Sequence, residues 1–237
     1  MSYTDASSAP SLPQSPCVPD PRGSVLRSLF SGRSCHYRHK EHLFLEGDSC
    51  AGVFLITSGR VIVYTVTLNG QRQVQSFAGP GDLLGLNFSG LHTTSAEALG
   101  DVTADMMPRC VFDRVLQTSD GFRKAIFERI DQMMEAARNQ NTLLGCKGAL
   151  EKTATFLMDL DARFSNGGPS YVPIPMSRSD IADFLGLTLE TVSRMLSRLK
   201  SQNVIDLPKA NCFRILDRRG LYRIAGVEVE RIRKCPL

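Results

Sequence analysis

The chain has 237 residues, of which 42% are hydrophobic and 22% are charged, and its formal net charge is +4. This length and composition predict one or two globular domains with substantial cores. No stretch reaches the roughly 18 apolar residues of a membrane span, the amino terminus has no signal-peptide pattern, and the seven cysteines are too widely spaced for a secreted disulfide framework. We therefore expect a cytoplasmic protein with reduced thiols and no membrane partner.

The positive charge is concentrated toward the carboxyl end of the chain. Residues 171–237 hold 12 Lys and Arg against 7 Asp and Glu, whereas residues 1–170 hold 16 against 17. A surface that binds phosphates needs such an excess of cations. The distribution therefore favours a nucleic-acid partner for the C-terminal part.

The first half of the chain begins with a proline-rich arm and continues with short β-type runs. Residues 1–22 carry five prolines among serines and few apolar groups, so we expect a disordered arm. Farther on, glycine-containing turns recur about every 10 to 12 residues, the spacing typical of an antiparallel roll or barrel. The expected strands are His42–Leu45, Val53–Ile56, Arg60–Val66, Gln73–Phe77 and Met106–Phe112. Residues 23–117 are thus predicted to form an antiparallel β-roll.

A cysteine and three histidines near the start of this roll raise the question of a zinc site. Cys35, His36, His39 and His42 lie within eight residues. On a strand, however, side chains alternate between faces, so His39 points away from His36 and His42. A solvated basic strand is the favoured interpretation. Because no catalytic or phosphate-binding motif occurs either, we expect no metal, no cofactor and no enzymatic activity.

A long amphipathic helix is expected over residues 121–144, within a segment 118–146. Its apolar residues recur at helical spacing and must be buried. Two partners for this stripe remain open: the helix's own roll, or a second copy of the chain in a coiled coil, for which basic side chains beside a narrow stripe are typical. The candidate dimerisation residues are Phe122, Ile126, Ile130, Met133, Ala137 and Leu144.

Residues 147–237 carry the pattern of a winged helix-turn-helix. A helix is expected over Lys147–Phe164, ended by Asn166–Pro169. Ser177 followed by Asp180 predicts a helix start, and Gly186 predicts a sharp turn. Thr188 then precedes a second helix. Residues 204–207 and 212–216 would form a small hairpin, residues 218–225 a short helix and residues 228–237 a tail.

The second helix has an outer face suited to reading bases. Val192, Met195, Leu196 and Leu199 share its inner face, which leaves Glu190, Ser193 and Arg194 outside. Arginine can donate to guanine O6 and N7, glutamate can accept from cytosine N4, and Leu189 offers an apolar contact to a thymine methyl. The alternative is an ordinary helical hairpin with a solvated face.

The run Glu190-Thr191-Val192-Ser193-Arg194 matches the E-x-x-S-R motif of the CRP/FNR superfamily of bacterial transcription regulators, and residues 181–194 resemble its FNR and FixK branches. The resemblance implies an α+β chain with an N-terminal β-roll of cyclic-nucleotide-binding type, a dimerisation helix and a C-terminal winged helix-turn-helix. It also implies a homodimer on a palindromic double-stranded DNA operator. Leu189, Glu190, Ser193 and Arg194 would read a TTGA-type half-site. Residues expected to contact the DNA backbone or to position these readers are Ser177, Arg178, Thr188, Thr191, Ser197 and Lys209.

Two sensor types of the superfamily do not fit this sequence. A cyclic-AMP binder has a glutamate that binds the ribose, and this chain has Leu86 at that position. Thr94 stands where such a binder has an arginine for the cyclic phosphate, so a buried phosphate would lack its cation. The N-terminal cysteines are too far apart for an iron–sulfur motif. What remains resembles the FixK type, and this resemblance implies control of genes for microaerobic or anaerobic respiration or for nitrogen fixation. A roll gated by an unidentified small ligand stays open as the alternative.

Activators of this superfamily also contact RNA polymerase through loops of the roll. Residues 86–92 contain apolar groups beside a glycine, and exposed apolar groups there would suit a protein partner. The candidate contacts are Asn87, Phe88 and Ser89. Packing of the apolar members into the core is the alternative.

Overall fold

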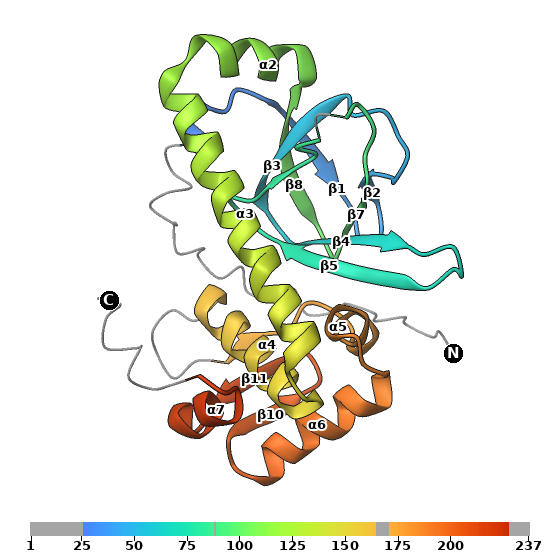
Figure 1. Cartoon of the computed structure of the whole chain (residues 1–237), viewed down its shortest axis with the longest axis vertical. Helices are drawn as coiled ribbons and strands as arrows, with labels where there is room; N and C mark the ends of the chain where they lie inside the picture. Colours follow the sequence, from blue (N-terminus) through green and yellow to red (C-terminus); the bar gives the residue numbers. More distant parts are fainter. Residues whose placement is uncertain (1–25, 88, 165–170, 228–237) are drawn as a thin grey trace, which may run out of the picture.

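The structure, a computed structural model, describes residues 26–87, 89–164 and 171–227 (Figure 1). Residues 26–29 are helical and lead into a β-roll of two antiparallel sheets with strand orders β1-β8-β3-β6 and β2-β7-β4-β5. The strands are β1 Arg33–Tyr37, β2 His42–Phe44, β3 Gly52–Ser58, β4 Val61–Val66, β5 Arg72–Ala78, β6 Leu83–Leu84, β7 Ser95–Ala98 and β8 Val102–Pro108. The predicted antiparallel roll is confirmed. The expected arm 1–22, the turn 166–169 and the tail 228–237 lie outside the described residues.

The inner faces of the two sheets close on each other through apolar side chains. Phe54 and Ile56 of β3 meet Val61 and Val63 of β4, together with small residues such as Ala96. The turn between β3 and β4 depends on Gly59, which has a φ of +84°, and a Cβ there would lie 2.3 Å from the carbonyl oxygen of Asp101. No side chain fits that approach. The roll is therefore a packed unit whose turns are set by glycine.

One expected strand is wrong at both ends. Residues 106–112 were expected as a strand, but β8 begins at Val102 and stops at Pro108, and helix α2 begins at Arg109, running to Thr118. Proline has no N–H for a sheet ladder and suits the start of a helix, which explains the change at this point. Strands β1, β6 and β7 were not among the expected strands. The sequence of β7, Ser-Ala-Glu-Ala, has low β propensity, and this strand pairs with its neighbours β2 and β4.

Helix α3, Asp120–Cys146, runs along the roll and continues to the C-terminal part (Figure 1). The side chain of Ser119 caps it by accepting a hydrogen bond from the amide of Phe122. Its first turns enter a core formed with α2, β3 and the residues Leu26 and Phe30 before β1, in which Phe112 and Phe122 pack edge to face at 5.5 Å. No helix in the described parts of the chain is long and apolar enough to span a bilayer.

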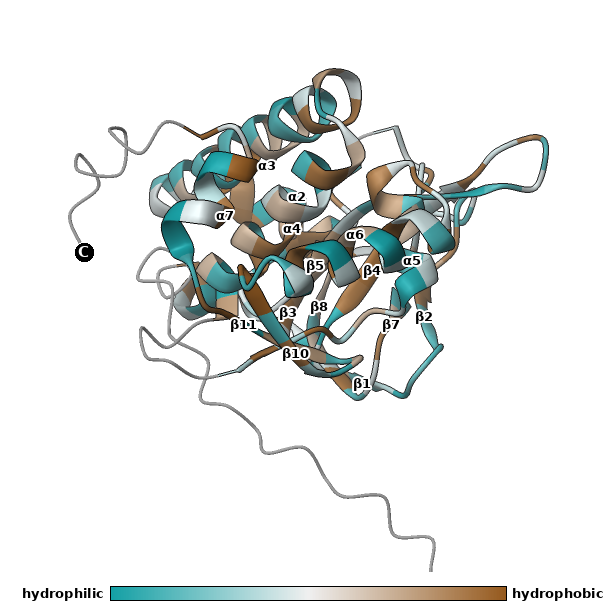
Figure 2. Cartoon of the chain, turned by 90° about the horizontal axis from the view of Figure 1, so that it is seen from below, coloured by the Kyte–Doolittle hydropathy of each residue, from teal (hydrophilic) through white to brown (hydrophobic). Residues whose placement is uncertain are grey.

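The C-terminal part is a winged helix-turn-helix, as expected. It contains helix α4 Ala149–Phe164, strand β9 Val172–Pro173, helices α5 Arg178–Leu185 and α6 Leu189–Ser201, strands β10 Ile205–Lys209 and β11 Cys212–Ile215, and helix α7 Arg218–Ile224. Strand β11 lies between β10 and β9. Seen from this end, the helices show hydrophilic residues on the outside and hydrophobic ones behind them (Figure 2). A shared core holds the helices and the wing together.

Candidate nucleic-acid interface

The first helix of the motif, α5, is started by a complete capping box. The Asp180 amide donates to Ser177 Oγ at 3.1 Å, and the Ser177 amide donates to Asp180 Oδ2 at 2.9 Å. Ser177 Oγ also donates to the same carboxylate oxygen at 2.7 Å. These bonds satisfy amides that a helix start leaves free. The helix ends at Gly186 in the left-handed conformation, with φ 60°, so that the chain can turn into the next helix.

The second helix, α6, divides into a buried and an exposed face as the spacing predicts. Thr188 caps it by accepting from the Thr191 amide at 3.2 Å. Its inner face is buried through Val192, Met195, Leu196 and Leu199. Leu189, Glu190 and Arg194 are exposed, and Ser193 is half-buried. The first two turns therefore present the four candidate base-reading residues on the outside of the molecule.

The charged members of this face are free to meet a ligand. Within the described parts of the chain, no hydrogen bond or ion pair occupies the side chain of Glu190 or Arg194. Two neighbours are engaged within the helix: Ser197 Oγ donates to the carbonyl oxygen of Ser193 at 3.0 Å, and Thr188 Oγ1 donates to Thr191 Oγ1 at 3.0 Å. The exposed charged groups can thus meet base edges without first breaking an internal contact.

The wing is tied to the first helix by an arginine that was expected at the DNA backbone. Arg178 Nη2 donates to the carbonyl oxygen of Ala210 at 3.0 Å, at the turn between β10 and β11. Burial lowers the pKa of Arg178. The structure thus places this side chain between helix and wing, where it holds their relative position, and it leaves Lys209 exposed at the end of β10.

An extra carboxylate at Ser177 is expected to weaken the motif. In Ser177→Asp the new carboxylate would face that of Asp180, replacing a hydrogen bond with repulsion of like charges. We expect the melting temperature to fall by a few degrees, equivalent to about 1 kcal/mol, and DNA affinity to fall as well. Thermal denaturation and fluorescence anisotropy with labelled DNA measure the two effects.

Ser179→Asp is the matched control, because Ser179 is exposed on the same helix turn. An acidic residue in the first turn favours the helix dipole, so this variant should keep its melting temperature while still repelling phosphates. Equal stability of the two variants would show that the carboxylate at position 177 does not meet Asp180.

The candidate dimerisation residues separate into two groups on α3. Phe122 and Ile126 are fully buried in the core that α3 forms with its own roll, so they are not available to a partner, in contrast to their assignment from the sequence. Ile130 borders that core, and Leu144 is half-buried. Met133 is 44% exposed and Ala137 is exposed. In the single chain, therefore, only the first two turns of the expected stripe are buried, and they are buried against the same chain.

A different set of apolar side chains remains uncovered on α3. Phe127 is 63% exposed and Met134 is 50% exposed, although both are large and apolar. They lie seven residues apart, and with Ile130 and Ala137 they follow the three-four spacing of a coiled-coil seam. We call Phe127, Ile130, Met134 and Ala137 the α3 seam. Exposed side chains of this size at this spacing are typical of a helix that packs against a second helix.

The interior of the roll does not fit a cyclic nucleotide. Leu86 packs beside the core of α2, α3 and β3 and offers no carboxylate to a ribose. Ser95, next to Thr94, is buried and its Oγ already accepts the Glu46 amide at 3.0 Å. His92 stacks on Phe44 at 3.9 Å, and burial lowers the pKa of this histidine. The positions that would contact the ribose and the phosphate thus carry Leu86 and Thr94, with neither a glutamate nor an arginine.

The candidate polymerase loop is held together by one asparagine. Asn87 Nδ2 donates to the carbonyl oxygen of Leu91 at 2.6 Å, and Asn87 Oδ1 accepts from the amide and hydroxyl of Ser89. Arg109 Nη1 donates to the carbonyl oxygen of Asn87 at 2.6 Å. Phe88 lies outside the described residues. Because Asn87 shapes the loop, Ser89 and Leu91, which are exposed, are the better positions at which to probe a partner.

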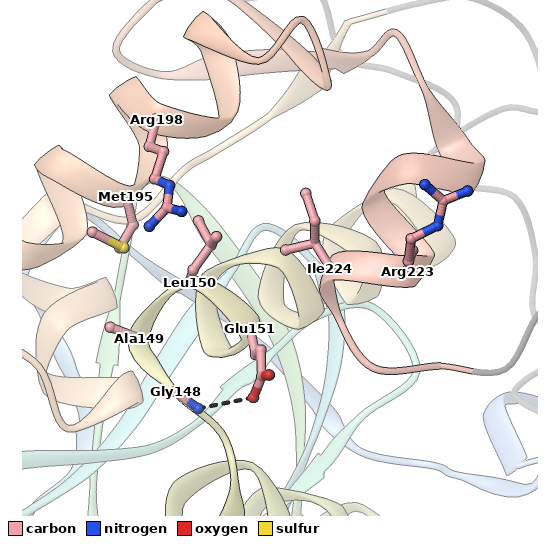
Figure 3. Close-up of a pocket in the computed structure, with 8 residues that line it drawn as sticks. All are labelled: Gly148, Ala149, Leu150, Glu151, Met195, Arg198, Arg223 and Ile224. Carbon is pink, nitrogen blue, oxygen red and sulfur yellow. Dashed lines mark hydrogen bonds between the residues drawn. The ribbon is translucent and has the colours of Figure 1, made fainter.

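An open hollow of about 520 Å³ lies between α4, α6 and α7 (Figure 3). The Gly148 amide donates to the Glu151 carboxylate in it at 2.9 Å, and Arg198 and Arg223 stand exposed at its rim.

The histidines and Cys35 of the roll form no metal-ligand cluster among the described residues. His36 instead contacts Thr103 at 3.1 Å and His42 contacts Tyr64 at 3.0 Å, on different sheets.

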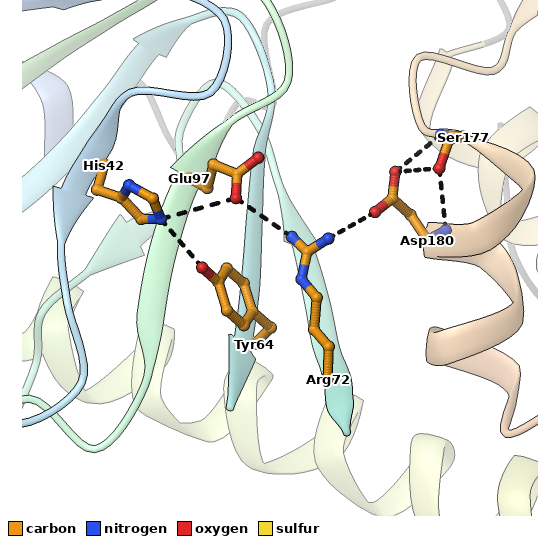
Figure 4. Close-up of polar contacts among 6 residues, drawn as sticks. All are labelled: His42, Tyr64, Arg72, Glu97, Ser177 and Asp180. Atoms are coloured by element: carbon orange, nitrogen blue, oxygen red, sulfur yellow. Dashed lines mark hydrogen bonds and ion pairs between the residues drawn. The ribbon is translucent and has the colours of Figure 1, made fainter. Parts of the chain in front are cut away.

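Sequence reasoning missed one arginine that connects the roll to the motif. Arg72 of β5 binds Asp180 of α5, at a sequence separation of 108 residues (Figure 4). No local pattern marks such a pair. The only available signal was an arginine at the start of an otherwise unremarkable strand.

Comparisons with known proteins cover both halves of the chain. Residues 34–119 match the cyclic nucleotide-binding domain model, and residues 151–224 match the Crp-like helix-turn-helix domain model. Nitrogen fixation regulation protein FixK of Bradyrhizobium diazoefficiens is 38% identical over 176 residues, which are 73% of this chain and 74% of that protein. Transcriptional activatory protein AadR of Rhodopseudomonas palustris is 35% identical over 171 residues, 71% of this chain and 72% of that protein. The structure of FixK2 from Bradyrhizobium japonicum matches with a TM-score of 0.79 and 30% identity, covering 84% of this chain and all of that one.

Proposed function

The chain belongs to the CRP/FNR family of transcription regulators, and from this premise we propose that it binds, as a homodimer, an inverted repeat with TTGA-type half-sites and acts mainly as an activator. Its relatives are transcription regulators and not enzymes. Their names describe regulation of nitrogen fixation or of fumarate and nitrate reduction. The proposed targets are accordingly genes of microaerobic or anaerobic respiration or of nitrogen fixation.

The observation that carries this proposal is the exposed face of α6. Glu190 and Arg194 project from a helix whose start is capped and whose other face is buried, and no partner within the described residues occupies them. A helix enters the major groove with the residues of its first turns at the base edges. Thr188, Thr191, Ser197 and Lys209 surround this face, and we assign them, with Ser177 and Arg178, to backbone contact or positioning.

The α3 seam supports the dimer. Two copies packed along Phe127, Ile130, Met134 and Ala137 would cover side chains that the single chain leaves in water. A two-fold axis along this seam would place two reading helices on one side of the assembly. Residues 118–146 are then the dimerisation helix between the roll, 23–117, and the DNA-binding part, 147–237.

The packed roll supports regulation without a cyclic nucleotide. We propose that the protein acts in the cytoplasm without cofactor, and that residues 87–89 contact RNA polymerase. The second candidate function is a regulator whose DNA binding waits on a small effector. The half-buried position of Thr94 and the apolar surroundings of Leu86 would suit a ligand other than a cyclic nucleotide.

A binding titration without additives tests the proposal. We expect tight binding of purified protein to a labelled TTGA inverted repeat, with half-site centres about one helical turn, roughly 34–36 Å, apart. Fluorescence anisotropy should show at least about 1,000-fold weaker binding to scrambled DNA. A single half-site and added cyclic AMP are the controls. Binding that appears only after an effector is added would favour the second function.

A further inference from the structure

Arg72 of β5 lies at the contact between the roll and the helix-turn-helix, with charged or aromatic groups on three sides (Figure 4). Its guanidinium group lies over the ring of Tyr64, 4.0 Å from the centroid. Nη2 is 3.5 Å from the carboxylate of Glu97 in the same sheet, and Nη1 donates to Asp180 Oδ1 at 2.9 Å. Tyr64 and Glu97 of the roll thus hold the guanidinium group in place, and its Nη1 points toward the DNA-binding part.

The carboxylate that Arg72 reaches is the one that starts α5. Asp180 Oδ2 accepts the Ser177 amide and hydroxyl, while Oδ1 accepts from Arg72. One side chain therefore both completes the capping box and connects to the roll. Because α5 passes through the tight turn at Gly186 into α6 and shares its core, a rotation of α5 carries the reading helix with it.

Apolar side chains pack around this polar contact, but apolar packing by itself does not fix the relative orientation of the two parts. Phe77 of β5 packs against Phe184 of α5 at 5.1 Å and Phe156 of α4 at 6.3 Å. Burial of apolar area favours contact but tolerates sliding, whereas a hydrogen-bonded ion pair fixes geometry. The aromatic cluster accounts for attraction between the two parts. At α4, Arg163 Nη1 donates to the carbonyl oxygen of Phe77 at 3.2 Å, and Arg60 lies over the ring of Phe164 at 3.9 Å. The pair of Arg72 with Asp180 is the ion pair that reaches α5, the first helix of the motif.

Arg72 is poorly placed to act through stability alone. Its side chain is 29% exposed, and within the described residues its buried Nε finds no hydrogen-bond partner, while Nη2 has only the 3.5 Å ion pair with Glu97. A buried donor without a partner costs free energy, and partly buried ion pairs often add little net stability. The contact is better suited to selecting one orientation than to holding the chain folded.

We propose that Arg72 is a positioning residue for DNA recognition, which acts through Asp180 to set the angle of the helix-turn-helix on the roll. In a dimer joined at α3, this angle sets the distance and tilt between the two reading helices. Arg72 thereby determines which operator spacing is read, although it touches no base. This inference rests on the proposed binding of an inverted repeat.

The test measures spacing selectivity in Arg72→Met and Asp180→Asn. Methionine keeps apolar contact with Tyr64 without the charge, and asparagine keeps an oxygen for the Ser177 amide. Affinities are measured for inverted repeats with the preferred spacer and with spacers one base pair shorter or longer. We expect each variant to lose about tenfold affinity at the preferred spacer and less at the others, so that the preference flattens.

Three comparisons make the result decisive. The double variant should lose no more than either single variant, because the two residues act as one contact. Arg72→Lys keeps the positive charge and should retain part of the spacing preference. Arg38→Met changes an exposed arginine of the roll, directly after β1, and should behave as wild type. Two outcomes would overturn the inference while leaving the proposed function intact. One is an equal loss of affinity at every spacer together with a lower melting temperature, and the other is an unchanged preference for the spacer length. Failure of the wild-type protein to bind any inverted repeat would overturn the proposed function and the inference with it.

Discussion

Replacing Met134 with glutamate is expected to turn the dimer into monomers and to abolish binding to the inverted repeat at micromolar concentration. Met134 is half exposed in the single chain, so the new side chain is tolerated in the folded monomer. In the α3 seam, however, it would bury a carboxylate from each copy without a partner. The cost is about 3 kcal/mol or more, at least roughly 100-fold in the dimer constant.

Sedimentation velocity reports the oligomeric state, and anisotropy with the inverted repeat reports the consequence for DNA binding. Ala136→Glu is the matched control, because it adds the same charge at an exposed position on another side of the same helix. It should remain dimeric with normal affinity. If Met134→Glu sediments as a dimer and binds normally, the two copies meet at some other surface.

Arg194→Ala is expected to weaken operator binding by about 1–3 kcal/mol, or roughly 5- to 150-fold, and to remove the preference for the base pair that it reads. The guanidinium group is exposed and makes no internal contact within the described residues, so the substitution should leave the melting temperature unchanged. A base contact is distinguished from a phosphate contact by the loss of discrimination between base pairs in addition to the loss of affinity.

The measurement is a titration against the cognate site and against sites mutated at each half-site position. Arg198→Ala, one turn farther along α6 and also exposed, is the comparison variant. Any phosphate contact it makes should alter affinity for cognate and scrambled DNA by the same factor. The same uniform loss in Arg194→Ala would reassign Arg194 to the backbone.

Local sequence patterns were enough for the helix-turn-helix. The cap at Ser177, the turn at Gly186 and the inner face from Val192 to Leu199 each depend on residues within one helical turn of one another, where side-chain chemistry and periodicity act directly. The same holds for strands β2 to β5 of the roll, which are separated by glycine turns. The exposure of Glu190 and Arg194 follows from the same periodicity.

What the sequence could not determine are contacts between segments far apart in the chain. The apolar stripe on α3 predicted a face that must be covered, but only the packed structure shows that Phe122 and Ile126 face their own roll while Phe127 and Met134 stay exposed. The strand β7 forms only because β2 and β4 flank it. Likewise, the pairing of Arg72 with Asp180 requires β5 and α5 to come together, a consequence of how the whole chain packs. Periodicity along one segment specifies which face is buried, whereas the identity of the partner is decided only when distant segments compete for that face in three dimensions.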